Sequence, residues 1–205
     1  IELCGDRVPF GTDLLFESAG VVVGVELCED LWVPIPPSSY LVQQGADIIV
    51  NLSATNELIG KHSYLLSLVR QQSARCVAGY VYASAGFGES STDLVFAGNG
   101  LVVENGSILA ESKRFSSTPQ LVVSEIDVER LRTERRVMTS FAKGAWAHGR
   151  DARFIPFVLN DIPLRLTRKV GAFPFVPSDS FVLNERCAEI LDIQSSGLAK
   201  RLLHT

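Results

Sequence analysis

The stretch GVVVGVELCEDLW, residues 20–32, decides the predicted fold. Four valines and a leucine lie around Gly24 and Glu26, and the run ends at Cys28 and an acidic pair. A short valine-rich segment bounded by a glycine and by charges predicts a strand at residues 20–27 that is buried on both faces. In open α/β sheets, ligands and reacting groups gather at the carboxyl ends of strands. Cys28 is therefore a candidate nucleophile.

Cys28 also has a simpler interpretation, because an isolated cysteine is commonly a small buried hydrophobic residue. The next two residues, Glu29 and Asp30, are negative and should raise the pKa of the Cys28 thiol rather than lower it. A reactive thiolate then needs a base or a cation from elsewhere in the chain, together with donors for an oxyanion. The backbone N–H directly after the cysteine can supply one such donor.

The residues after Cys28 predict two helices that alternate with two further strands. The helices lie at residues 38–46 and 60–75, and the strands at residues 47–50 and 76–84. Three strands joined by two helices are typical of a β-α-β-α-β unit, in which right-handed crossovers make the strands parallel. The first 20 residues predict a loop and an edge strand.

Local signals predict where these helices begin, end and pack. Ser38 and Ser39 are suitable N-caps for the first helix, and Gly45 ends it. The longer helix should pack through one apolar face. That face is formed by Tyr64, Leu65, Leu68, Val69 and Ala74.

Beyond residue 84 the pattern changes to short strands separated by Asn-Gly turns, which are the strongest local signal of a β-hairpin. We expect strands at residues 94–97, 100–103, 107–111 and 121–126. Asp127 should then cap a charged helix. These antiparallel strands, added to the parallel unit, predict a mixed sheet.

The C-terminal part carries four of the nine prolines and predicts extended chain rather than an independent domain. A helix follows from about residue 183, with apolar residues at helical spacing: Cys187, Ile190, Leu191, Leu198 and Leu202. An amphipathic helix needs a surface to pack on, which we expect to lie beyond residue 205. The predicted division is a domain at residues 1–140, a connector packed on it at 141–182, and the start of another domain at 183–205.

The composition limits the classes of function. The chain has 205 residues, 46% of them hydrophobic, and a formal charge of −4. It can therefore build one core of moderate size, and we expect neither nucleic acid nor a membrane as its partner. No apolar run approaches the ~20 residues that span a bilayer. The four cysteines form no CxxC pair and the three histidines are dispersed, so we expect no metal site and a reduced, cytoplasmic setting.

Polar residues follow two of the predicted parallel strands and should meet Cys28 at the carboxyl edge of the sheet. Ser53 and Thr55 follow the second strand, and Ser84 ends the third. Small hydroxyls there can hold a polar substrate, but they are equally typical of turns. Lys61 opens the long helix and is either a binding group or a solvated charge.

Other motifs carry less information about chemistry. The glycine-rich pieces GFGESS and AGNG match neither of the common phosphate-binding glycine patterns. Three dispersed histidines do not support a Ser-His-Asp assembly. Trp32 and Trp146 are more typical of packing residues, and Trp32 is also retained as a candidate substrate contact.

Three long segments resemble the nitrilase-type glutaminase domain of glutamine-dependent NAD synthetases. They are GVELCEDLWVPIPPSS, GADIIVNLSATNELIGKHSYL and YVYASAGFGESSTDLVFAGNGLVVENGSILAES. The agreement covers most of residues 5–140, in order and with the same spacings. The closing IQSSGLAKRL resembles the helix with which that family enters its synthetase domain. The resemblance implies an α/β fold, a nitrilase-like four-layer α-β-β-α sandwich with mixed sheets, here truncated at its N-terminal end.

The resemblance also implies a Glu-Lys-Cys triad whose cysteine attacks the side-chain amide of glutamine. A thioester forms, and the released ammonia serves the amidation of deamido-NAD to NAD. Cys28 matches the nucleophile, and Glu29 matches a substrate-contacting glutamate whose backbone N–H faces the oxyanion. Thr55, usually a serine in the family, and Lys61 match positions near the amino-acid end of glutamine. Ser53 and Trp32 are further candidate contacts.

The family's general-base glutamate and its lysine correspond to positions before Ile1, and its synthetase domain, with ATP and magnesium, to positions after Thr205. We therefore expect the chain alone to be inactive as a glutaminase, to hold no cofactor itself and to belong to a homo-oligomer. Two alternatives stay open, a stand-alone nitrilase-type amidase and a non-catalytic interaction module. The terminal helix argues against the amidase, and selective alkylation of Cys28 in the intact enzyme would argue against the module.

Overall fold

The computed structural model describes residues 1–89, 92–144, 152–159, 166–168, 172–173 and 175–204. The chain forms two compact units, Ile1–Leu166 and Thr167–Thr205. Every described strand belongs to the first unit, and the second contains the long helix α5 (Ser180–Leu202). The predicted domain boundaries at residues 140 and 182 stay predictions.

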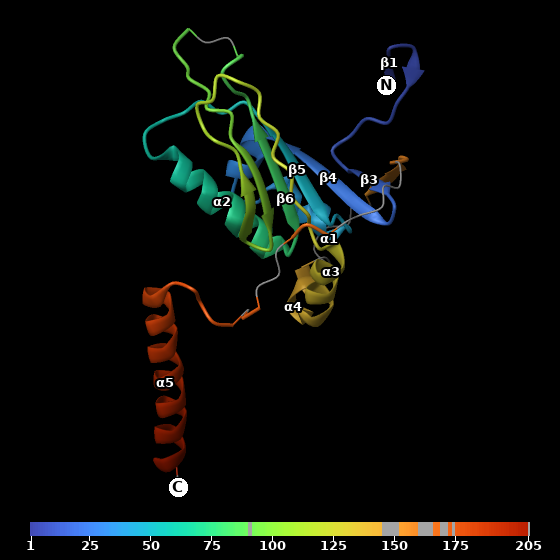
Figure 1. The fold of residues 1–205 in the computed structure, drawn as a ribbon. Helices are drawn as coiled ribbons and strands as arrows, with labels where there is room; N and C mark the ends of the chain where they lie inside the picture. Colours follow the sequence, from blue (N-terminus) through green and yellow to red (C-terminus); the bar gives the residue numbers. More distant parts are fainter. Residues whose placement is uncertain (90–91, 145–151, 160–165, 169–171, 174, 205) are drawn as a thin grey trace. The chain divides into compact units, whose positions relative to one another are not determined.

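Three parallel strands form the centre of the first unit (Figure 1). They are β4 (Val21–Leu27), β5 (Ile48–Ser53) and β6 (Gly79–Ser84). Two helices, α1 (Pro37–Gln43) and α2 (Lys61–Cys76), connect them in turn. The predicted β-α-β-α-β unit is therefore confirmed, and the polar residues that follow these strands meet at one edge of the sheet.

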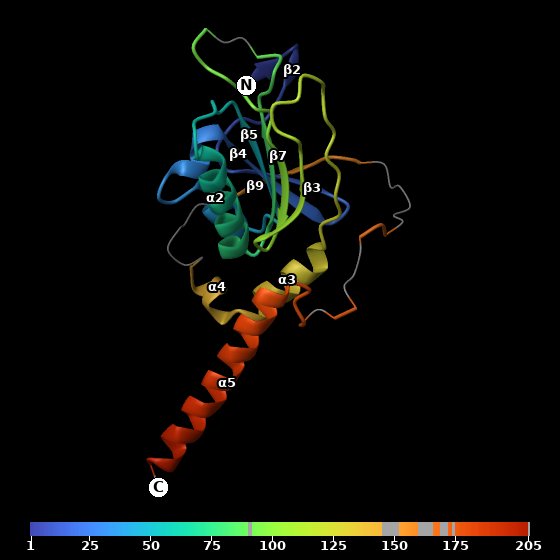
Figure 2. The same cartoon turned by 60° about the vertical axis from the view of Figure 1, so that its left-hand side comes forward.

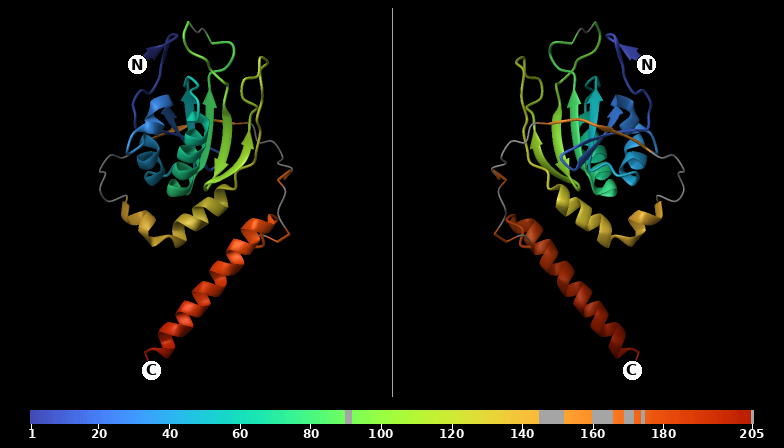
Figure 3. Two further views of the ribbon diagram at one scale, coloured as in Figure 1. Left: turned by 90° about the vertical axis from the view of Figure 1, so that its left-hand side faces the viewer. Right: turned by 90° about the vertical axis from the view of Figure 1, so that its right-hand side faces the viewer.

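Antiparallel strands extend this unit into a seven-stranded mixed sheet with the order β8-β7-β6-β5-β4-β3-β9. The added strands are β3 (Leu14–Ser18), β7 (Gly100–Glu104), β8 (Ser107–Glu111) and β9 (Arg153–Pro156). The hairpin of β7 and β8 turns at Asn105 and Gly106, both with positive φ, as an Asn-Gly turn requires (Figure 3). The predicted mixed sheet is confirmed. The strand expected at the edge, β3, instead lies between β4 and β9. A separate two-stranded sheet joins β1 (Glu2–Leu3) and β2 (Asp6–Arg7).

Two predicted strands, at residues 94–97 and 121–126, are absent from the described structure. Residues 94–97 make isolated backbone hydrogen bonds instead of a ladder, such as the one from Glu57 N–H to the Val95 carbonyl at 2.7 Å. In the second segment, Ile126 packs over Gly79, where an added Cβ would lie 2.9 Å from the Ile126 Cδ1 atom. Ile126 therefore packs on the face of the sheet instead of pairing within it, whereas Leu121 and Val123 of the same segment are 88% and 75% exposed.

The prediction that β4 is buried on both faces is wrong. Val22, Gly24 and Glu26 are buried on the side where α1 packs, and an added Cβ on Gly24 would lie 3.2 Å from the Leu41 side chain. Val25 and Leu27 point to the opposite face and are 38% and 57% exposed. Side chains alternate along a strand. Among the described residues, α1 packs against β4 and β5, and α2 packs beside α1 against β6 and β7 (Figure 2).

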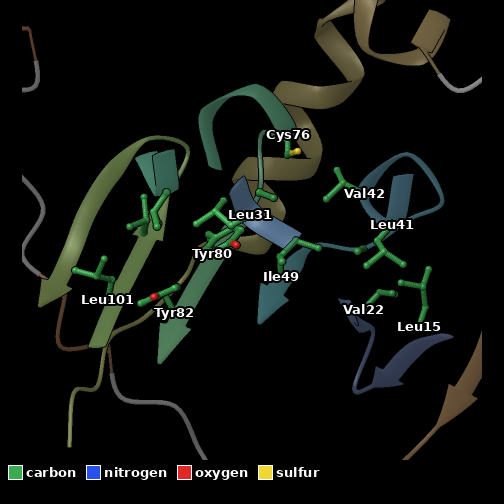
Figure 4. Packing of buried hydrophobic residues seen from close by; sticks show 14 of the residues in the cluster. Leu15, Val22, Leu31, Leu41, Val42, Ile49, Cys76, Tyr80, Tyr82 and Leu101 are labelled. Atoms are coloured by element: carbon green, nitrogen blue, oxygen red, sulfur yellow. The ribbon is translucent and has the colours of Figure 1, made fainter. Parts of the chain in front are cut away.

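The hydrophobic core lies between the sheet and these two helices (Figure 4). Ile49 of β5 lies near Leu41 and Val42 of α1 there, whereas Tyr82 of β6 lies beside Leu101 of β7 in another part of the same cluster. The predicted apolar face of α2 is confirmed at Leu65 and Val69 and is completed by the buried residues Gln72, Ser73 and Cys76. Tyr64 and Ala74 were expected inside and are exposed, and Tyr64 packs against the Trp32 ring with centroids 5.6 Å apart.

A carboxylate accepts a backbone hydrogen bond at the N-terminus of each of two helices, α1 and α3 (Val128–Val137). The predicted N-caps Ser38 and Ser39 lie inside α1, whose N-cap is Pro36. The reason is that the buried Glu26 Oε2 accepts a hydrogen bond from the Ser38 N–H at 2.8 Å and thereby replaces a serine cap. The predicted cap of α3 is confirmed, because Asp127 Oδ1 accepts from the Arg130 N–H at 2.9 Å. A short helix, α4 (Thr139–Gly144), follows.

A buried ion pair fastens α3 to the sheet. Asp47, directly before β5, accepts hydrogen bonds from Arg132 Nε at 2.9 Å and Nη2 at 2.6 Å. Its Oδ2 atom also accepts from the Val22 N–H of β4 at 3.0 Å. Asp47 therefore joins two central strands and the helix.

The second unit contains α5, which begins at Ser180 with Asp179 as N-cap, three residues before the predicted start. Its predicted apolar residues are exposed to solvent: Ile190, Leu191, Leu198 and Leu202. Among the described residues, no helix combines the length and the hydropathy needed to cross a bilayer.

Candidate active site

Cys28 lies where β4 ends and the short 3-10 helix η1 (Cys28–Trp32) begins. Its φ is +42°, in the left-handed region that residues other than glycine rarely adopt. Such backbone strain is typical of functional sites. The Asp30 carboxylate holds the turn, because its Oδ2 atom accepts from the Leu27 N–H at 2.8 Å. The strand therefore turns sharply at the thiol, which is half-buried.

Hydrogen-bond donors converge on the Cys28 sulfur, chiefly from the last residue of β5 and the loop after it. Ser53 Oγ donates to Sγ at 3.5 Å. The Thr55 hydroxyl and the backbone N–H groups of Ala54 and Glu29 also interact with it. All of these partners are neutral groups. They favour the thiolate over the thiol, because hydrogen bonds to a charged form stabilise that form.

The predicted effect of the acidic neighbours on Cys28 is wrong. Burial raises the pKa of the Cys28 thiol, but the hydrogen bonds from Ser53, Ala54, Thr55 and Glu29 together outweigh it, and the pKa lies below its ordinary value. The reason is orientation, because Asp30 turns back to the Leu27 backbone and the Glu29 side chain is exposed. A thiol with a lowered pKa is a better nucleophile near neutral pH.

A second layer of hydroxyl groups lies behind these donors. Tyr82 of β6 donates from its hydroxyl to Ser53 Oγ at 2.9 Å. The Thr55 N–H donates to Ser84 Oγ at 3.5 Å. The parallel register places Ser53 opposite Ser84. The structure thus brings together Cys28 and the three hydroxyl residues that the sequence placed at this edge.

A buried carboxylate lies two residues before Cys28. Glu26 is 2% exposed, accepts a hydrogen bond from the Tyr80 hydroxyl and another from the Ser38 N–H. Asn51 Nδ2 donates to the same tyrosine oxygen at 3.1 Å. Burial and the Glu26 charge raise the pKa of Tyr80, so its hydroxyl stays a donor. These contacts satisfy Glu26 on the helix side of the sheet.

Lys61 and Trp32 contact each other at the start of α2. The Lys61 ammonium lies 5.4 Å from the centroid of the Trp32 ring, within the range of a cation–π interaction. It donates to the Asn56 carbonyl at 2.8 Å. Lys61 is thus held against the loop that follows Ser53 and contains Thr55. His62 pairs with Glu111 of β8 at 3.1 Å, and Trp146 lies outside the described residues.

Sequence reasoning missed Tyr82 and Glu26. Glu26 interrupts an apolar strand at a position that alternation assigns to the same face as Val22 and Gly24, which was a usable signal. Tyr82 lies 29 residues after Ser53, and only the pairing of β5 with β6 reveals their contact. In the described part of the chain, histidine, cysteine and carboxylate side chains form no group of three or more that could hold a metal ion.

Comparison with known sequences points to one family. The model of the carbon-nitrogen hydrolase family matches residues 5–136. The glutamine-dependent NAD(+) synthetase of Mycobacterium tuberculosis is 44% identical over 211 residues, which cover 98% of this chain and 31% of that protein. The chain therefore spans about a third of the length of the curated relatives that it matches.

Comparison with solved structures agrees with the match to the carbon-nitrogen hydrolase family. A carbon-nitrogen hydrolase from Helicobacter pylori superimposes with a TM-score of 0.55 at 20% identity, covering 66% of this chain and 50% of that one. A glutamine-dependent NAD(+) synthetase from Cytophaga hutchinsonii gives a TM-score of 0.51 at 25% identity, covering 60% of this chain and 19% of that one. The predicted nitrilase-like fold class is confirmed.

Proposed function

Because the chain belongs to the carbon-nitrogen hydrolase family, we propose that Cys28 is the nucleophile of a glutaminase site in a glutamine-dependent NAD synthetase. One observation carries the proposal. Cys28 lies in a strained turn at the end of a central strand, and four neutral donors converge on its sulfur and lower its pKa. A purely structural cysteine needs neither the strain nor the donors.

The proposed reaction has two steps. The Cys28 thiolate attacks the side-chain amide carbon of glutamine, the C–N bond breaks as the nitrogen gains a proton, and ammonia leaves a thioester on the sulfur. Water then attacks the thioester carbon, the C–S bond breaks, and glutamate leaves. The family resemblance assigns the proton transfers to a glutamate and a lysine at positions before Ile1.

The described residues supply the remaining contacts in this proposal. The Glu29 N–H, which already interacts with the sulfur, is placed to stabilise the oxyanion once the sulfur bonds to carbon. The exposed Glu29 carboxylate suits the ammonium group of glutamine, and Lys61 suits its carboxylate. Thr55, Ser53 and Trp32 are further proposed contacts at this edge.

The remaining partners belong to the part of the relatives that this chain does not span. We assign ATP, magnesium and deamido-NAD to that part, and the ammonia released at Cys28 would serve the amidation of deamido-NAD there. Homo-oligomer formation is also part of the proposal.

The test uses the full-length protein that contains this chain. A diazoketone analogue of glutamine should label Cys28 alone among the four cysteines, as read by peptide mass spectrometry. Cys28→Ala should abolish NAD formation from glutamine and retain NAD formation from ammonium. Cys187→Ala, which changes an exposed cysteine of α5, is the matched control and should retain both activities.

Other outcomes would identify the alternatives. Glutamine-dependent NAD formation that survives in Cys28→Ala would support a non-catalytic module and overturn the proposal. Faster hydrolysis of other small amides than of glutamine, without NAD formation from ammonium, would support a stand-alone amidase.

A further inference from the structure

The hydroxyl of Tyr82 takes no part in the proposed reaction, yet it connects to the nucleophile. We propose that Tyr82 is a positioning residue that acts through Ser53, by orienting the Ser53 hydroxyl so that its proton points at the Cys28 sulfur. This inference rests on the proposed function. It changes the role of Ser53 from a substrate contact to a donor that prepares the thiolate.

The direction of the hydrogen bonds follows from the inventory of donors. Tyr82 Oη donates to Ser53 Oγ at 2.9 Å. A serine hydroxyl has one proton to give and accepts through its lone pairs. Because Ser53 accepts from Tyr82, its own proton is available to Cys28 Sγ at 3.5 Å. The chain of hydrogen bonds therefore ends at the sulfur.

The scaffold holds this chain of hydrogen bonds rigidly. Tyr82 comes from β6, Ser53 from the end of β5 and Cys28 from the end of β4, so the three groups cross three adjacent parallel strands. The Tyr82 side chain is 1% exposed and belongs to the hydrophobic core (Figure 4). A donor fixed by core packing loses little freedom when it orders its partner.

Burial also keeps the Tyr82 hydroxyl protonated, so that it can donate a hydrogen bond to Ser53. Burial raises the pKa of the Tyr82 hydroxyl, and the negative charge of a Cys28 thiolate raises it further, against the hydrogen bonds with Ser53, Ser84 and Thr55 that lower it. Tyr82 therefore remains a donor across the neutral range. A water molecule in the place of this hydroxyl could donate or accept and would leave the Ser53 proton unoriented.

Tyr80 provides a matched comparison within the same strand. It is equally buried and lies on the same face of β6 as Tyr82. Its hydroxyl donates to Glu26 instead of to the Ser53–Cys28 pair. Removing the Tyr80 hydroxyl therefore changes a buried tyrosine without changing the hydrogen bonds that end at the sulfur.

The experiment measures alkylation of Cys28 by iodoacetamide in the full-length enzyme, as a function of pH and by peptide mass spectrometry. Below the thiol pKa, the rate follows the thiolate fraction. Ser53→Ala should lower the rate at pH 6 by roughly two- to tenfold, the value of one neutral hydrogen bond, and Tyr82→Phe should lower it by a smaller factor. Ser53→Thr keeps a hydroxyl and should restore most of the rate. Tyr80→Phe should keep the wild-type pH profile.

The double variant Ser53→Ala/Tyr82→Phe decides whether Tyr82 acts through Ser53. Its rate should equal that of Ser53→Ala alone, because Tyr82 has no further effect once the serine hydroxyl is gone. Independent, multiplying effects would overturn the proposal, as would a wild-type profile in Tyr82→Phe. If Tyr82→Phe fails to fold, a Ser53→Ala profile equal to that of wild type overturns it.

A failure of the proposed glutaminase function can be distinguished from a failure of the positioning role of Tyr82. Alkylation needs no glutamine, so a wild-type enzyme without glutaminase activity would disprove the function alone. The pH profiles would still test the positioning role.

Discussion

Asp47 offers a quantitative test of how the sheet and α3 are held together. Its carboxylate is 1% exposed and accepts three hydrogen bonds, two from Arg132 and one from the Val22 N–H. Arg135 Nη1 lies 3.9 Å away and adds a second positive charge. The perturbation that removes these contacts together is Asp47→Ala.

The expected magnitude follows from the two kinds of loss. Removing one partner of a buried ion pair typically costs about 3–5 kcal/mol. The Arg132 side chain is 34% exposed, and water can solvate its charge once Asp47 is removed. The cost of breaking the ion pair is therefore below this range here. The Val22 N–H loses its acceptor, which costs about 1–3 kcal/mol for a buried group. We expect Asp47→Ala to lower the free energy of unfolding by about 3 kcal/mol.

The assay is urea denaturation of the chain followed by tryptophan fluorescence, with the variants Asp47→Ala, Arg132→Ala and both together. The double variant should lose less than the sum of the single losses, because the two side chains share their interaction. Glu129→Ala is the control: Glu129 pairs with Arg132 at 3.4 Å but is 79% exposed, so its loss should stay below about 0.5 kcal/mol. A loss under about 1 kcal/mol in Asp47→Ala, or additive losses in the double variant, would refute the reasoning.

Three further predictions concern the sheet, a buried thiol and the proposed substrate site. Gly79→Val should lower the free energy of unfolding by about 1–3 kcal/mol in urea denaturation, because its Cβ would lie 2.9 Å from the Ile126 Cδ1 atom. Burial raises the pKa of Cys76 from 9.0 to about 11. The unfolded chain therefore loses this proton first, and the contribution of Cys76 to stability should fall by about 2–3 kcal/mol between pH 9 and pH 11. Denaturation of wild type and Cys76→Ala across this range checks the difference, and parallel stability curves would contradict it. Lys61→Met in the full-length enzyme should raise the KM for glutamine roughly tenfold or more with little change in kcat, as measured by ammonia release, and an unchanged KM would exclude Lys61 from the substrate site.

The parts of the fold that sequence could predict are those set by local patterns. Runs of β-branched apolar residues identified β4 and β5, helical periodicity identified α2, and an Asn-Gly pair identified the β7–β8 hairpin. Each of these signals lies within about ten to fifteen neighbouring residues. The Asp127 cap of α3 is of the same kind, because the acceptor lies three residues from its donor.

The parts that sequence could not predict depend on distant or directional contacts. A valine-rich strand has the same sequence pattern whether one face or both are covered, so the exposure of Val25 and Leu27 had no local signal. The pKa of Cys28 depends on which way Asp30 turns, and its hydroxyl donors arrive from a different strand. The sequence predicted which residues of the candidate site lie at the edge of the sheet. It could not predict which of them donate hydrogen bonds to which, because that depends on the structure.

The positive φ of Cys28 has a consequence for protein engineering. A glycine adopts this conformation without a steric penalty, whereas a cysteine holds it only because the surrounding turn enforces it. Replacing Cys28 with glycine should therefore raise the melting temperature of the protein while it removes the proposed nucleophile. Selection for thermostability alone would tend to discard the proposed nucleophile, so a screen of variants of this protein should always measure turnover together with melting temperature.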